Sequence, residues 1–101
     1  MAAGVLVITS NGYGKVMDPA DFRQQSRGGK GVGCFKVTED SGPVAVVLRV
    51  PLGEGERVLV ATEQGQAILT PVDDIPSRSR NAGGVKIISL AEGDQVTGAA
   101  V

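Results

Sequence analysis

The sequence has 101 residues, a formal net charge of −1, no histidine and one cysteine. This length is enough for one small domain. No run approaches the ~18 apolar residues of a membrane span, so we expect no membrane partner. Cys34 cannot form an internal disulfide, which is typical of the reducing cytoplasm. Fifteen glycines and five prolines interrupt segments rich in Val, Ile and Leu, which predicts short strands and turns in an all-β chain.

The chain repeats itself at an offset of 53 residues. Residues 5–39 align with residues 58–92 without a gap, and eleven of these 35 positions are identical. One turn is shorter in the second copy, after which residues 43–47 align with residues 95–99. We therefore divide the chain into two repeats, residues 1–53 and residues 54–101.

In chain order, the first repeat is expected to form four strands. They cover residues 5–9, 15–17, 31–37 and 44–50. Asn11-Gly12 predicts a tight hairpin with left-handed dihedrals between the first two strands. A polar, glycine-rich loop over residues 21–30 separates the second strand from the third. The second repeat copies this order with strands at 58–62, 67–70, 84–90 and 96–101, and a loop over 72–83.

Four short strands at this period predict propeller-like blades that stack on one another. Two blades are too few to close a ring, and open strand edges pair readily with another chain. We therefore expect either a piece of a longer protein or a subunit whose blades are strand-exchanged or completed by other chains. Three copies of the chain would supply a ring of six blades.

The loop of the first repeat carries a recognisable heptad. Residues 25–31 read Gln-Ser-Arg-Gly-Gly-Lys-Gly and closely resemble the Gln-Arg-Arg-Gly-Gly-Lys-Gly box of the bacterial DNA gyrase A protein. The chain departs from the box at Ser26, and residues 78–84 are a degenerate copy. Residues 9–15, 36–44 and 90–96 are also similar to that protein, in the same order. The chain thus resembles the C-terminal β-pinwheel of gyrase A and of its topoisomerase IV counterpart, and its 11–15 turn is most similar to the last two blades.

This resemblance implies a DNA-binding, DNA-wrapping module of a type II topoisomerase. In that family the domain bends duplex DNA around a basic rim, and strand cleavage and ATP hydrolysis belong to other parts of the enzyme. The expected partners are double-stranded DNA and the rest of the topoisomerase. The module itself is not expected to be an enzyme or to hold a cofactor. The parent, gyrase or topoisomerase IV, stays open.

The candidate DNA-binding residues are basic residues and the glycines among them. Two glycines let the backbone approach a phosphate, and the flanking cations neutralise it. The alternative is a solvated turn whose glycines only supply unusual dihedrals. The heptad supplies Gln25, Arg27, Gly28, Gly29, Lys30 and Gly31, and the extended track adds Lys15, Arg23, Lys36, Arg78, Arg80 and Lys86.

Other chemistry is excluded by the residues that the chain lacks. Without histidine and with one cysteine, neither a zinc site nor a histidine-based triad can form. Tyr13 lies between two glycines in a turn, so it is not expected to be a catalytic tyrosine. Phe22 and Ile75 are equivalent and are expected in the core between blades. The alternative function, which the acidic net charge favours, is a self-assembling β-repeat subunit or a gyrase-modulating protein with little DNA affinity.

Overall fold

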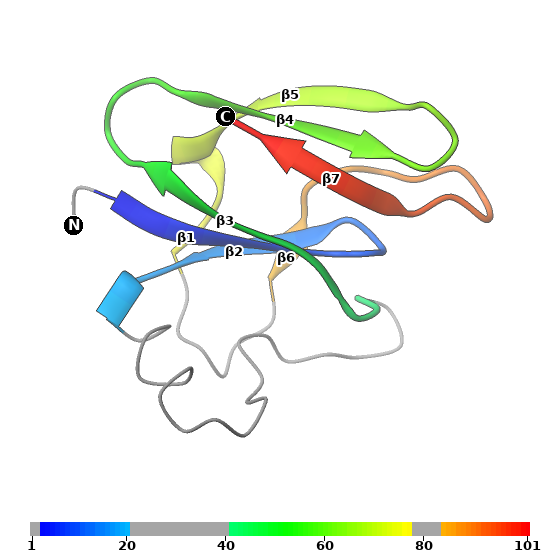
Figure 1. The fold of residues 1–101 in the computed structure, drawn as a ribbon, viewed down its shortest axis with the longest axis horizontal. Coiled ribbons are helices and arrows are strands. Elements are labelled where there is room, and N and C mark those ends of the chain that lie inside the picture. Colours follow the sequence, from blue (N-terminus) through cyan, green and yellow to red (C-terminus); the bar gives the residue numbers. More distant parts are fainter. Residues whose placement is uncertain (1–2, 21–40, 78–83) are drawn as a thin grey trace.

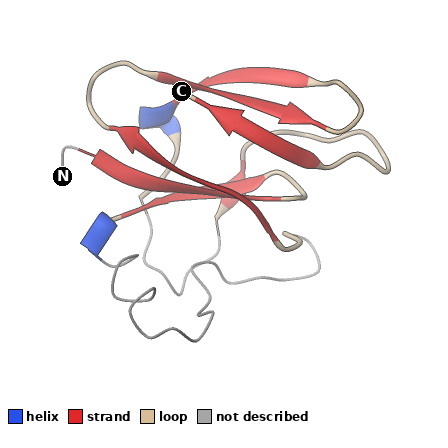
Figure 2. Ribbon diagram, in the orientation of Figure 1, coloured by secondary structure: helices blue, strands red, loops and turns tan. Residues whose placement is uncertain are grey.

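The computed structural model describes residues 3–20, 41–77 and 84–101, which form two antiparallel sheets (Figure 1). Strands dominate the described chain (Figure 2). They are β1 (Ala3–Thr9), β2 (Tyr13–Met17), β3 (Val44–Pro51), β4 (Arg57–Thr62), β5 (Ala67–Pro71), β6 (Val85–Lys86) and β7 (Val96–Ala100). One turn of 3-10 helix, η1 (Val72–Asp74), follows β5. In the described chain, no helix is long and apolar enough to cross a membrane.

The first sheet takes its strands from both repeats. Its order is β3–β1–β2–β6, so β1 pairs with β2 on one side and with β3 on the other. β6 belongs to the second repeat in sequence, yet it pairs with β2, with Lys86 opposite Tyr13 and Val85 opposite Gly14. The segment before β6 also lies beside β2, because Val16 of β2 donates its N–H to the carbonyl of Pro76 at 3.0 Å. A strand of the second repeat therefore completes the sheet of the first.

The second sheet has three described strands, in the order β5–β4–β7. In the alignment of the two repeats, β4 corresponds to β1, β5 to β2 and β7 to β3. Among the described strands, none pairs with β5 on the side that β6 occupies beside β2. Within the described structure, the edge of β5 is therefore the open counterpart of an edge that is paired in the first sheet.

The same turn joins the first two strands of each blade. Gly12 donates its N–H to the carbonyl of Thr9 at 3.0 Å, and Gly65 donates to the carbonyl of Thr62 at 3.1 Å. Each threonine Oγ1 also accepts the N–H of the residue four positions ahead, at 3.1 and 3.0 Å. The φ angles of the two glycines are +91° and +89°. The predicted left-handed backbone is thus present at Gly12, whereas no described residue other than glycine has a positive φ.

The two sheets stack on one apolar core. Leu6, Ile8 and Val16 of the first sheet share this core with Val58 and Val60 of the second, and all five side chains are buried. Burying a side chain of this size contributes about 1.5–3 kcal/mol. Ile75 also lies in the core, as predicted, and Phe22 lies outside the described residues.

The sheets stack head to tail. Leu6 is equivalent to Leu59 and Val16 to Leu69, and Leu6 and Val16 face the second sheet. Leu59 and Leu69 lie opposite each other on the far side of the second sheet, 45% and 57% exposed. The second sheet therefore leaves uncovered the same face that the first sheet buries. We call this surface the Leu59 face, and its residues on β4 and β5 are Arg57, Leu59, Ala61, Ala67, Leu69 and Pro71.

The strand predictions agree with the structure in six of the described elements, within two residues at each end. The exception is the third strand of the second repeat, predicted over 84–90 and observed only at Val85–Lys86. Beyond Lys86 the chain leaves β2, and Ile87 and Ile88 instead donate their N–H groups to the carbonyl of Gly12. The third strand predicted over 31–37 lies outside the described residues.

Candidate nucleic-acid interface

Two of the twelve predicted DNA-binding residues lie in the described structure, Lys15 on β2 and Lys86 on β6. The remaining predicted positions lie outside the described residues; they are Gln25, Arg27, Gly28, Gly29, Lys30, Gly31, Arg23, Lys36, Arg78 and Arg80. For these residues, contact with DNA stays a prediction.

Lys15 is buried. Its position on β2 lies opposite Val7 and on the same side of the sheet as Met17, and both of these residues are also fully buried. The predicted basic track requires an exposed cation at this position. The structure instead buries Lys15, because the alternation of β2 sets its side chain beside Val7 and Met17. Contact between Lys15 and DNA stays a prediction, and we leave Lys15 out of the exposed surface.

Lys86 is exposed and is positioned by close backbone contacts between the repeats. Ile87 donates its N–H to the carbonyl of Gly12 at 2.7 Å. A Cβ at Gly84 would clash with the backbone of Gly14, and a Cβ at Gly14 would clash with the side chain of Ile87. Because these glycines lack a side chain, the second repeat approaches β2 closely and Lys86 is held at its edge.

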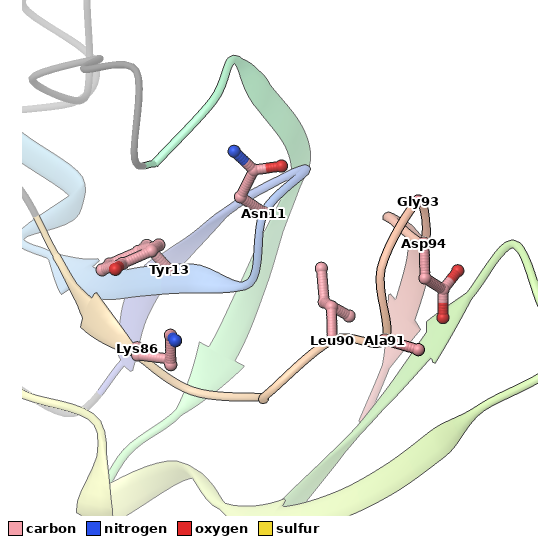
Figure 3. Close-up of a pocket in the computed structure, with 7 residues that line it drawn as sticks. All are labelled: Asn11, Tyr13, Lys86, Leu90, Ala91, Gly93 and Asp94. Atoms are coloured by element: carbon pink, nitrogen blue, oxygen red, sulfur yellow. The ribbon is translucent and has the colours of Figure 1, made fainter.

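Lys86 and Tyr13 line an open pocket of about 360 Å³ where the two repeats meet (Figure 3). The Nζ atom of Lys86 lies 6.0 Å from the centroid of the Tyr13 ring, at the limit of a cation–π interaction. Asn11 and residues from the 90–94 segment form the other walls. From the sequence Tyr13 is only a turn residue, because neither segment alone reveals that β6 pairs with β2.

Asp94 fixes the wall of the pocket that the second repeat supplies. Its Oδ1 accepts the backbone N–H of Gln64 at 2.9 Å and that of Gln95 at 2.8 Å. Burial raises the pKa of Asp94, but hydrogen bonds from the Thr62 side chain and these two N–H groups outweigh it, so the pKa lies below its ordinary value. In Figure 3 the carboxylate points away from Tyr13 and Lys86. Asp94 therefore acts as a brace for the turn.

Arg49 is an exposed cation that sequence analysis did not select. It lies opposite Val5 on the outer face of the first sheet, the same face that carries Lys15 and Lys86. The four described strands of this sheet contain no Asp or Glu. The pairing of β3 with β1 assigns Arg49 to this face. In the sequence, the alternation of side chains along 44–50 could have indicated which side of the strand Arg49 occupies.

Comparison with known families decides the relationship. The model of the DNA gyrase C-terminal domain, a β-propeller, matches residues 5–51 and again residues 56–101. The chain belongs to the DNA gyrase C-terminal domain family. The resemblance inferred from the heptad and the turns is therefore confirmed, and the two matches follow the internal repeat.

Individual relatives agree with this membership. The DNA gyrase A protein of Haloquadratum walsbyi is 41% identical over 92 residues, which is 91% of this chain and 10% of the relative. That of Deinococcus deserti is 38% identical over 98 residues, 97% of this chain and 12% of the relative. The chain thus spans about a tenth of the length of the gyrase proteins that it matches.

Solved structures support the fold. A DNA gyrase A C-terminal domain superposes with a TM-score of 0.77 at 17% identity, over 95% of this chain and 32% of that one. The C-terminal domain of a DNA topoisomerase IV gives a TM-score of 0.65 at 17% identity, over 97% of this chain and 29% of that one. The all-β, blade-like architecture expected from the repeat is confirmed.

Proposed function

We propose that this chain is a non-catalytic, DNA-wrapping module of a cytoplasmic type II topoisomerase, which contacts duplex phosphates without base specificity on a basic rim. The observation that carries this proposal is the match of the gyrase C-terminal domain family to both repeats. The gyrase proteins it resembles are about ten times longer, so the rest of a topoisomerase is the proposed partner. The heptad at 25–31 and its flanking cations are the proposed phosphate contacts.

The charge of the described strands supports the proposal. The acids of the described chain lie in turns, connections and η1, whereas the exposed Arg49 and Lys86 lie on strands without any acid. Cations on such a surface neutralise phosphates and position a protein on a duplex without reading its sequence. A contact of this kind suits wrapping, in which the path of the DNA matters more than its bases.

Duplex binding measured over a range of salt concentrations tests the proposal. We expect affinity to fall with salt, with a log–log slope of about −0.9 for each phosphate contact. Changing Arg27 and Lys30 together to Ala should weaken binding and reduce the slope by about two contacts. Arg57→Ala is the control, because Arg57 is an exposed cation on the second sheet. Salt-insensitive binding, or no effect of the double change, would contradict the proposal.

A second candidate function, assembly of blades, is favoured by the Leu59 face. Leu59 and Leu69 are largely exposed, although their equivalents in the first sheet are buried against the next sheet. Among the described strands, the edge of β5 is open where β2 is paired with β6. We propose that this end of the molecule accepts a further blade, from the same polypeptide or from another copy. Light scattering of the isolated chain at rising concentration tests the second source, and a strict monomer would contradict it.

A further inference from the structure

We infer that the pocket between Tyr13 and Lys86 receives one backbone phosphate of duplex DNA, with Lys86 supplying the charge and the Tyr13 hydroxyl a hydrogen bond. The inference rests on the proposed function. It adds to that function a defined contact point on the surface and a neutral residue, Tyr13, beside the basic ones.

The pocket is built jointly by the two repeats. Tyr13 comes from β2 and lies directly opposite Lys86 in the β2–β6 register. The contact of Gly84 with the backbone of Gly14 fixes how closely the two strands approach. The facing wall is braced through Asp94. Because both walls are held by backbone contacts, the pocket is formed before any ligand arrives, which reduces the ordering cost of binding.

The chemistry of the pocket suits a phosphate better than a base. Lys86 is exposed, and its Nζ atom lies 6.0 Å from the centroid of the Tyr13 ring, so a positive charge stands beside the phenol. An ammonium and a phenolic hydroxyl are both donors, and phosphate oxygens are acceptors. Two acids belong to the wall segment: Asp94, whose carboxylate is turned away, and Glu92, which is exposed to solvent.

Tyr13 offers a direct reporter of the pocket, since the chain contains one tyrosine and no tryptophan. Ring-labelled tyrosine gives NMR signals from this residue alone. We expect a short blunt-ended DNA duplex to shift these signals in the wild-type chain. The Arg57→Ala chain, which loses the same charge on the other sheet, should show the same shift.

Affinity measurements separate the two donors. Lys86→Ala should reduce the salt slope of duplex binding by about 0.9, the share of one phosphate, and Lys86→Arg should restore it. Tyr13→Phe should weaken binding about two- to tenfold and leave the slope unchanged, because the lost hydroxyl is neutral. Both changes are expected to fold normally, because Lys86 is exposed and Phe keeps the ring.

The outcomes distinguish this inference from the proposed function. If the wild type binds duplex with a salt-dependent affinity but Lys86→Ala keeps the full slope, the pocket is not a phosphate site and the proposed function stands. Unmoved Tyr13 signals under the same conditions overturn it equally. If the wild type does not bind duplex even at low salt, the proposed function fails and this inference fails with it.

Discussion

At the scale of single residues, the two repeats use different hydrogen-bond acceptors at the same turn, and Asp94 is the acceptor in the second repeat. Its carboxylate accepts the N–H of Gln64 in the second repeat. At the equivalent turn of the first repeat the acceptor is a backbone atom, the carbonyl of Ser41, which receives the N–H of Asn11 at 3.3 Å. The second repeat has therefore replaced a backbone acceptor with an ionisable side chain, which makes its turn sensitive to pH.

Asp94→Asn should lower the melting temperature by a few degrees near neutral pH, because the amide oxygen is a weaker acceptor than a carboxylate. The native pKa of Asp94 lies below the unfolded value of about 3.9. Its stabilisation is therefore complete above that value and is lost as the pH falls through the native pKa. Thermal unfolding at several pH values checks this, with Glu92→Gln as an exposed control. An unchanged acid limb in Asp94→Asn would exclude the role.

At the scale of elements, the docking of β6 on β2 depends on Gly84. Gly84→Ala places a Cβ against the backbone of Gly14, which cannot yield as a flexible side chain can. We expect the change to cost about 1–3 kcal/mol in the free energy of unfolding, measured in urea. Gly98→Ala on β7 is the matched control, because a Cβ there meets nothing within 4 Å and should change stability by about 0.5 kcal/mol at most. Equal effects of the two changes would contradict the tight strand contact.

Several strands could be predicted from the sequence because they are short runs of apolar, partly β-branched residues with a glycine or proline nearby. Residues 58–62 and 44–50 are such runs, and they became β4 and β3 with small changes at their ends. β6 could not be predicted to its true length, since its end is set by the hydrogen bonds of Ile87 and Ile88 to Gly12, a residue of the other repeat. Local composition carries no information on a partner so distant along the chain.

The candidate site was less predictable than the fold for the same reason. Charge alone selected both Lys15 and Lys86. Both lie on the outer face of the first sheet, but Lys15 is buried opposite Val7 on β2, whereas Lys86 is exposed on the edge strand β6. Tyr13 is a candidate contact residue only because β6 places Lys86 opposite it in the sheet. Arg49 is assigned to the same face by the pairing of β3 with β1. Cross-strand neighbours therefore decide which basic residues are available to a ligand.

At the scale of the whole molecule, head-to-tail stacking leaves two unlike ends. The outer side of the first sheet buries Val7 and Met17, whereas the Leu59 face of the second sheet exposes its leucines. Leu6 is core in the first blade, whereas its equivalent Leu59 is at the surface of the second. Exposed leucines beside the β5 edge, which is unpaired among the described strands, favour association.

Changing Leu59 and Leu69 together to Thr should reduce self-association of the chain, because it removes the largest apolar side chains of the Leu59 face. Threonine is β-branched and suits a strand, so the strands should persist. Fold stability should change little, since neither leucine belongs to the core shared by the two sheets. Light scattering at rising concentration measures the effect. Val44 and Val47 are exposed on β3 of the other sheet, and changing both to Thr is the matched control. If both double variants associate as the wild type does, the Leu59 face is not the contact, and a further blade would have to be held by the β5 edge alone.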